Sequence, residues 1–171
     1  FAGLLGHWGQ LGPAEIEPKR AWTFRQVAWQ AQQLGIHIDT PAQHPFNPLA
    51  LLRLGLASAP ISGLPNRRVV ELLMRHAWRG GADANDAERL RALQAAVAPQ
   101  RDPAGESVKA ELRAHTEVAI ERGVFGVPTL YLGGEIFWGA DATAMAADYA
   151  AAGCRWTEPE YARVAGLPVG A

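Results

Sequence analysis

The side chains that could perform chemistry are few, and they form no metal or nucleophile motif. The chain has one cysteine, Cys154, so an internal disulfide, a Cys-x-x-Cys redox pair and a cysteine zinc cluster are excluded. The five histidines lack metal-ligand spacing, and one of them, His115, falls on the apolar face of an expected helix, so we expect no metal. No Gly-rich phosphate loop is present, which argues against a nucleotide cofactor.

The most informative stretch is residues 123–141, Gly-Val-Phe-Gly-Val-Pro-Thr-Leu-Tyr-Leu-Gly-Gly-Glu-Ile-Phe-Trp-Gly-Ala-Asp. Residues 129–132 and 135–138 have strand-forming composition, and the Gly-Gly pair between them supplies the positive φ angles of a tight hairpin. Pro128 either starts a strand, where proline is tolerated, or forms a cis bond that frees the main-chain groups of Val127. Asp141 then opens an alanine-rich helix expected to end at Gly153.

Five helices and almost no strand are expected before this stretch. Apolar residues recur at helical spacing, and proline, asparagine, aspartate or serine stands near each start. The first helix is expected to start near Pro18 and to end just before Gly35. The others are expected from Leu49 for about ten residues, from Arg67 to Trp78, from Asp86 to Val97, and from a Ser107 cap to Gly123. The glycine-rich start of the chain, residues 1–17, is expected to form a loop.

The composition of the chain argues against nucleic acid and membranes as binding partners. The chain has 171 residues, of which 49% are hydrophobic, and its 16 basic and 17 acidic side chains give a net charge of −1. That balance offers no electrostatic footprint for nucleic acid, and no apolar run approaches the roughly 20 residues needed to cross a bilayer. We therefore expect a soluble, cytoplasmic protein that binds neither nucleic acid nor membrane.

Residues 123–141, with residues 9–20 (Gly-Gln-Leu-Gly-Pro-Ala-Glu-Ile-Glu-Pro-Lys-Arg) and 44–49 (His-Pro-Phe-Asn-Pro-Leu), resemble the 2-hydroxychromene-2-carboxylate isomerase family. Its relatives are kappa-class glutathione transferases and bacterial disulfide oxidoreductases. The resemblance covers nearly the whole chain and implies an α/β class, a thioredoxin-like fold with an inserted all-helical domain. It implies a loop over 1–17, the helical domain over 18–122, the second half of the thioredoxin-like fold over 123–153 and a tail over 154–171.

The family's first strand, helix and strand would precede Phe1, and with them the serine that lies near the glutathione sulfur. The resemblance therefore assigns no catalytic residue to these 171 residues. We expect about 35–45 further residues ahead of Phe1, the length of three ordinary elements. We also expect the 171-residue chain alone to aggregate or need a partner, and to lack isomerase activity.

The resemblance implies glutathione as the cofactor, held by four residues of the informative stretch. Val127 would pair through its main chain with the cysteinyl unit, and Pro128 would be the cis-proline that presents it. Asp141 would receive the γ-glutamyl ammonium, and the N–H of Ala142 would bind the γ-glutamyl carboxylate. Asp141 could equally be a plain helix cap, and both roles can hold at once.

Weaker transfers concern Gln10, which would lie near the glycyl end of glutathione or near the acceptor substrate, and Lys19, which would lie where a cation can meet a carboxylate. Lys19 could equally be a solvated residue in the first turn of a helix. Trp8 and Trp138 could line the binding site of an aromatic substrate, although tryptophans are more often core residues. Asn47 is either a substrate-facing amide or a cap ahead of Pro48.

The activity implied by the resemblance is glutathione-dependent interconversion of 2-hydroxychromene-2-carboxylate and trans-o-hydroxybenzylidenepyruvate in naphthalene-type aromatic catabolism. The expected partner is therefore a small aromatic carboxylate, and a homodimer is left open. A kappa-type glutathione transferase and a non-catalytic thioredoxin-like binding domain are the alternatives. Cys154, outside the informative stretches, is expected to be dispensable.

Overall fold

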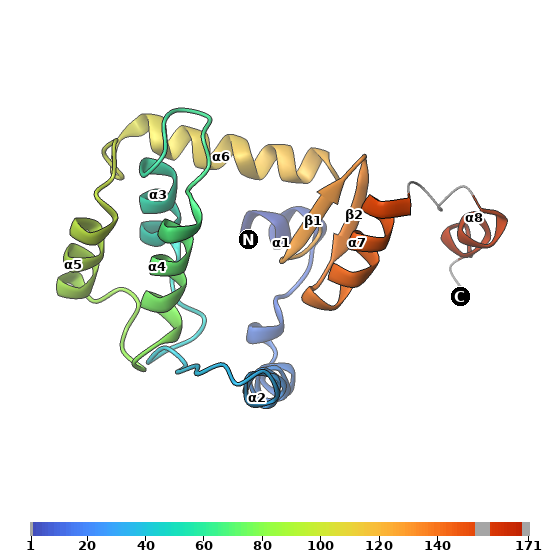
Figure 1. Cartoon of the computed structure of the whole chain (residues 1–171), viewed down its shortest axis with the longest axis horizontal. Coiled ribbons are helices and arrows are strands. Elements are labelled where there is room, and N and C mark those ends of the chain that lie inside the picture. The colour runs from blue at the N-terminus through green and yellow to red at the C-terminus, as the bar shows by residue number, and fades with distance from the viewer. Residues whose placement is uncertain (1, 153–157, 169–171) are drawn as a thin grey trace. The chain divides into compact units, whose positions relative to one another are not determined.

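The structure is a computed structural model that describes residues 2–152 and 158–168. The chain divides into two compact units, one made of Phe1–Trp8 with Val118–Ala171 and the other of Gly9–Glu117 (Figure 1). We call the first the hairpin unit and the second the helical unit. Cys154 and Gly153, where the alanine-rich helix was expected to end, lie outside the described residues.

The helical unit confirms the helices expected from periodicity. It holds η1 (Pro13–Glu15), α2 (Glu17–Gln33), α3 (Leu49–Ala57), α4 (Arg67–Trp78), α5 (Ala87–Val97) and most of α6 (Glu106–Glu121). Side-chain caps explain two of the starts, since the Asn66 side chain accepts from the Val69 N–H at 3.0 Å and Asp86 accepts from the Arg89 N–H at 2.8 Å. Pro48 occupies the N-cap of α3 rather than its first turn.

The core of the helical unit lies where α3, α4 and α5 meet, side by side in Figure 1. Its buried residues are Leu51, Leu54, Val69, Ala77, Leu93 and Val97. Phe46, Leu73 and Trp78 pack against this cluster. Each helix thus contributes residues three, four or eight positions apart, which is the spacing of one helical face.

The expected cap at Ser107 is wrong, because α6 already begins at Glu106. A turn at Asp102 precedes the helix, in which the Asp102 carboxylate accepts from the Ala104 N–H at 2.9 Å and the Asp102 carbonyl accepts from the Gly105 N–H at 3.0 Å. The Lys109 N–H then reaches the Gly105 carbonyl at 3.2 Å. The turn brings the chain into helical conformation one residue before the serine.

Arg101 joins three segments of the helical unit. Its guanidinium donates to the carbonyls of Leu56 and Ala59 at 2.6 and 2.9 Å and to the Glu111 carboxylate at 2.6 Å. Glu111 also accepts from the Ser62 N–H at 3.0 Å. The Arg101 hydrogen bond and, less strongly, the Ser62 N–H hold the pKa of the Glu111 carboxyl below its usual range, so the pair is charged at neutral pH.

The hairpin unit contains α1 (Ala2–Trp8), β1 (Thr129–Leu132), β2 (Glu135–Trp138), η2 (Ala140–Ala142), α7 (Thr143–Ala152) and α8 (Pro159–Ala165). The expected loop over 1–17 is wrong where α1 forms. Leu4 of α1 is only 4% exposed, so burial outweighs the low helix propensity of the nearby glycines. The tail expected over 154–171 likewise contains α8, with Pro159 at its first position.

The strands pair as the expected antiparallel hairpin, with Leu130 opposite Phe137. Gly133 and Gly134 have φ angles of 56° and 95°, which a two-residue turn of this kind requires. Phe137 is 1% exposed, and its ring lies 5.3 Å from that of Tyr149 on α7. Phe137 therefore packs its face of the hairpin on α7, while Leu130, its partner on that same face, stays 44% exposed.

We predict that Arg101→Met lowers the free energy of unfolding by about 2–3 kcal/mol, because it leaves two carbonyls and a mostly buried carboxylate short of donors. Since Glu111 has a lowered pKa in the fold, its contribution is present above the ordinary glutamate range and is lost as the pH falls through its folded pKa. Urea unfolding of the variant should therefore depend less steeply on pH in this acidic range.

Glu71→Gln is the matched control, because Glu71 pairs with Arg67 on the exposed face of α4. It should change stability little. Equal stability of Arg101→Met and the unmodified protein at neutral pH would show that Arg101 does not hold these segments together.

Candidate functional site

The candidate site centres on the main chain of Val127, within residues 123–141. The Val127–Pro128 bond is cis, as expected, and Val127 is 54% exposed. Within residues 2–152 and 158–168, its N–H and C=O have no hydrogen-bond partner. An exposed donor and acceptor on one residue can pair with an extended peptide as an added strand would.

Two hydrogen bonds hold this segment against the hairpin. The Gly139 N–H donates to the Pro128 carbonyl at 2.9 Å, which joins the chain before β1 to the chain after β2. The Thr129 hydroxyl donates to the Gly126 carbonyl at 2.7 Å and closes the turn between them. Val127 therefore lies at the tip of a turn fixed on both sides.

Trp138 flanks the same turn. It ends β2 opposite Thr129, its indole lies 5.2 Å from the Phe125 ring, and it is 56% exposed. Gly126 is buried beneath it, and a Cβ at that position would collide with the indole nitrogen. The glycine is required because the tryptophan packs directly on the backbone.

Trp8 belongs to the same unit. Its indole Nε1 donates to the Val124 carbonyl at 3.0 Å, three residues before Val127, and the side chain remains partly exposed. Neither Trp8 nor Trp138 is a core residue, so the alternative of a simple core role is wrong for both. Both present an exposed apolar ring. Trp138 is linked to the Val127 turn through its pairing with Thr129, and Trp8 through its hydrogen bond to Val124.

Asp141 and Ala142 are placed differently from expectation. Asp141 is exposed in the middle of η2 and is not a helix cap, since Gly139 precedes the turn and α7 begins at Thr143. The Ala142 N–H donates to the Gly139 carbonyl at 3.3 Å, so it is already used within the turn and is not a free donor. Asp141 folds back over Gly139, where a Cβ would collide with its carboxylate.

The other expected site residues belong to the helical unit. The Asn47 side chain accepts from the Leu49 N–H at 3.1 Å, so it stabilises the start of α3, as the helix-start alternative proposed. Lys19 is exposed in the first turn of α2. Gln10 is exposed two residues before Gly12, whose N–H donates to the Glu15 carboxylate at 3.0 Å.

His44, in the phrase that contains Asn47, is enclosed by aromatic rings. Phe24, Trp78 and Phe46 lie 5.1, 5.8 and 6.1 Å from its ring. Burial and, to a smaller extent, the charge of Arg20 hold the pKa of His44 below its usual range. His44 is therefore neutral at neutral pH, and we interpret it as part of the packing between α2 and α4.

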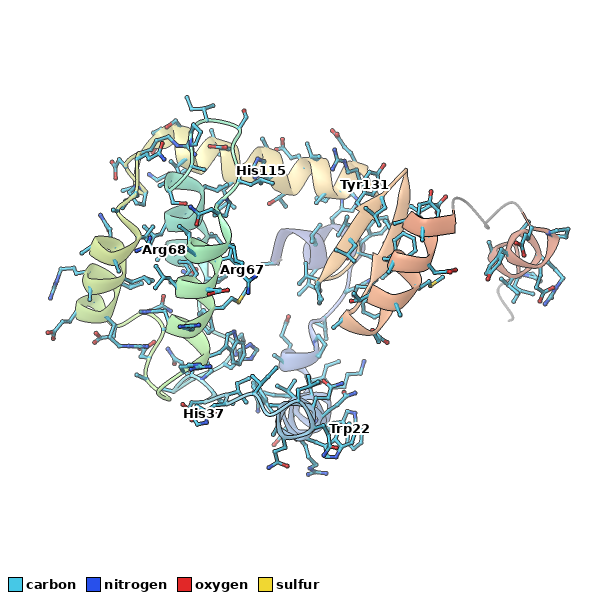
Figure 2. The ribbon with its side chains drawn as sticks, in the orientation of Figure 1. Trp22, His37, Arg67, Arg68, His115 and Tyr131 are labelled. Atoms are coloured by element: carbon cyan, nitrogen blue, oxygen red, sulfur yellow. The ribbon has the colours of Figure 1, made fainter. Side chains whose placement is uncertain are left out.

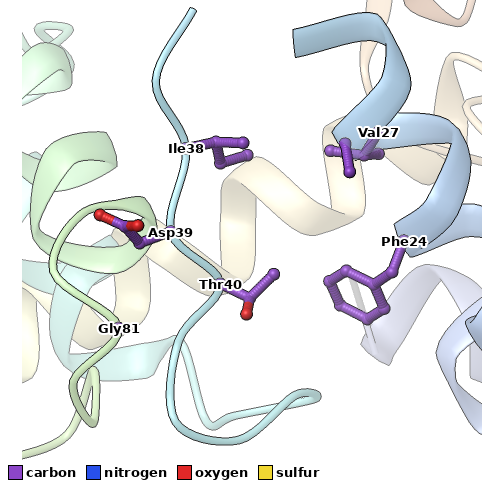
Figure 3. A pocket seen from close by; sticks show the side chains of 7 residues that line it. Phe24, Val27, Ile38, Asp39, Thr40 and Gly81 are labelled. Atoms are coloured by element: carbon purple, nitrogen blue, oxygen red, sulfur yellow. The ribbon is translucent and has the colours of Figure 1, made fainter. Parts of the chain in front are cut away.

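A small hollow of ≈ 330 Å³ lies between α2 and the segment that follows it. Figure 3 shows Phe24 and Val27 facing Ile38 and Thr40 across it, while the Asp39 carboxylate points away. Asp39 accepts from the Gly80 N–H at 2.9 Å, which lowers the pKa of its carboxyl and ties the segment to the end of α4. The hollow contains none of the expected site residues.

Residues 2–152 and 158–168 offer neither a cluster of metal ligands nor a helix that could span a membrane. No three histidine, cysteine or acidic side chains there are placed to share a metal ion. None of the helices described combines the length and apolar character of a bilayer span.

Comparison with known proteins places the fold. Residues 2–151 match the DSBA-like thioredoxin domain family. The chain belongs to this family. The solved structure of a selenomethionine-labelled 2-hydroxychromene-2-carboxylate isomerase is also similar, with a TM-score of 0.73 and 24% identity over 88% of this chain and 75% of that one. No curated protein matches the chain. The likeness establishes the thioredoxin-like fold with its helical insertion.

We predict that Gly126→Ala displaces the Trp138 indole and lowers the free energy of unfolding by about 1–3 kcal/mol, the usual cost of overpacking. The Trp138 Nε1–H resonance, assigned by NMR, should shift, and urea unfolding gives the stability change. Gly6→Ala is the matched control, since a Cβ there meets nothing within 4 Å and α1 should gain helix propensity. An unmoved indole resonance in Gly126→Ala would contradict the packing described.

Proposed function

We propose that this protein is a glutathione-dependent isomerase that interconverts 2-hydroxychromene-2-carboxylate and trans-o-hydroxybenzylidenepyruvate in aromatic catabolism. The observation that carries the proposal is that Val127, exposed at the tip of its turn, has a main chain without a hydrogen-bond partner among the described residues. Membership of the DSBA-like family and the fold shared with an isomerase of this name support it.

The residues present suit glutathione. Val127 offers one donor and one acceptor to the cysteinyl unit of an extended peptide, and Pro128 fixes them beside the hairpin. Asp141, exposed in η2, offers an anion to the γ-glutamyl ammonium. Ala142 is left out of the proposal because its N–H is engaged in the turn.

Bound glutathione supplies a thiol whose thiolate form can add reversibly to the substrate and leave again. The chain's own contribution is to hold glutathione and to orient it toward the substrate. The Val127 main chain would fix the peptide's direction, and Asp141 would anchor its amino end. The exposed rings of Trp8 and Trp138 would exclude water from one side of a flat substrate.

On the strength of the family resemblance alone, Gln10 is proposed to contact the glycyl end of glutathione, and Lys19 is proposed to meet a carboxylate. Both are exposed and so are accessible to a ligand. Asn47 is proposed only as a residue that shapes the substrate wall, because its amide oxygen already accepts from Leu49.

The test is turnover by the natural polypeptide that contains these residues. Substrate and isomer can be followed by NMR with and without glutathione, and the products analysed by mass. We expect isomerisation only when glutathione is present and no accumulation of conjugate. A stable conjugate would favour a kappa-type transferase, and binding without reaction would favour a binding domain.

We predict that Asp141→Ala weakens glutathione binding by about 1.5–3 kcal/mol, the range for a charge-assisted hydrogen bond. Asp141→Asn keeps the shape of the side chain but not its charge, so its affinity for glutathione should lie between those of the unmodified protein and Asp141→Ala. Calorimetric titration gives both values. Glu121→Ala is the control, an exposed carboxylate at the end of α6. Equal affinities of all four proteins would show that Asp141 does not meet the ammonium.

A further inference from the structure

An apolar cavity lies wholly within the helical unit, where α3, α4 and α6 come together. Its volume is ≈ 390 Å³, within the range of small-ligand sites. Leucines and an alanine of the helices form much of its wall. The remaining principal contributors are Phe46, Pro48, Met74, Trp78 and His115.

The floor and the mouth of this cavity differ in how deeply their side chains are buried. Leu51 and Ala77 on the floor are 7% and 5% exposed and belong to the core of the unit. Leu52 and Met74 also line the cavity but are 42% and 58% exposed, so they lie at its mouth. Ligand binding would therefore bury exposed apolar surface without rearranging the core.

The aromatic walls favour a flat ligand. Phe46 and Trp78 line the cavity and at the same time pack against the buried core, which fixes their rings. Fixed rings bind another ring by stacking or edge contact at little entropic cost. Phe46 and Pro48 flank Asn47, so the phrase singled out in the sequence reaches the cavity through its apolar neighbours rather than through the amide.

His115 sets the polarity of the ligand. Among the described residues that line the cavity, it alone has an ionisable side chain, and it projects from α6 (Figure 2). Glu111, one turn earlier on α6, is held by Arg101 and by the Ser62 N–H, so its charge is compensated. The cavity therefore offers an apolar body and one hydrogen-bond donor, without an uncompensated anion beside that donor.

We propose that this cavity binds the fused aromatic body of an aromatic carboxylate and that His115 receives the carboxylate at its edge. The inference rests on the proposed function for the choice of an aromatic acid as ligand, but not on glutathione. It concerns a site of the helical unit and does not replace the ring surfaces that Trp8 and Trp138 offer in the hairpin unit. At this site His115 distinguishes an aromatic acid from an uncharged aromatic compound, and Leu52 and Met74 form the entrance.

The test is calorimetric titration of the natural polypeptide with 2-naphthoate, in the absence of glutathione. Leu52→Trp should fill the mouth and weaken binding about 10-fold or more, the equivalent of about 1.4 kcal/mol. Met74→Trp is a second variant of the same kind. Ala50→Trp is the matched control, because Ala50 is exposed on α3 and does not line the cavity. It should leave the affinity unchanged.

A second pair of variants tests His115. His115→Gln should weaken 2-naphthoate about 10-fold, as expected for a hydrogen bond to a charged group, and leave the affinity for 2-naphthol unchanged. His37→Gln, on an exposed histidine outside the cavity, should alter neither. Equal loss for both ligands would overturn the role of His115 as the carboxylate contact.

The outcomes separate this inference from the proposed function. If Leu52→Trp and Met74→Trp bind 2-naphthoate as well as the unmodified protein does, or if the unmodified protein does not bind it, the cavity is not the ligand site. If 2-naphthoate binds as expected while glutathione does not bind in a parallel titration, the cavity inference stands and the proposed glutathione-dependent function fails.

Discussion

The pairing of β1 with β2 is fixed by one buried ring, and the arrangement around Val127 depends on it. Side chains alternate between the two faces of a strand, so placing Phe137 against α7 obliges Trp138 to face the other way. A slip of one residue would bury the Trp138 indole and expose the Phe137 ring. The register also sets where β2 ends, and hence that the Gly139 N–H reaches the Pro128 carbonyl.

In the helical unit, the hydrogen bonds of Arg101 constrain the structure as the buried Phe137 ring does in the hairpin unit. Arg101 brings together the end of α3, the loop after it and α6 through donors that neutral side chains could not supply in that number. The wall of the apolar cavity depends on this contact, because α3 and α6 both line it. A guanidinium network therefore stabilises the geometry of an apolar site without taking part in it.

Much of the fold could be predicted from the sequence, because its signals are local. Periodicity and caps located α2 to α5, and the Gly133–Gly134 pair located the hairpin. Segments whose conformation depends on packing or on a preceding turn were predicted less well. Residues 2–8 form a helix because Leu4 is buried, and α6 begins before Ser107 because the Asp102 turn leads into it.

The candidate site also has parts that could be predicted from local sequence and parts that depend on how the chain packs. The Val127 turn could be predicted because all its parts lie within twenty residues of one another, and a family resemblance names them. That the Ala142 N–H is engaged depends on a three-residue turn where a regular helix start was expected. The cavity could not be predicted at all, since Phe46 and His115 come to line one cavity only after three helices have packed.

The floor of the cavity is buried and its mouth is exposed, and this difference affects how the ligand preference of such a protein can change during evolution. Positions 52 and 74 are largely exposed, so replacing them costs the fold little. The same positions border the opening, where side-chain size decides which ring systems enter. Ligand preference in this lineage can therefore drift by single substitutions that selection for stability does not oppose, while the floor at Leu51 and Ala77 stays constrained.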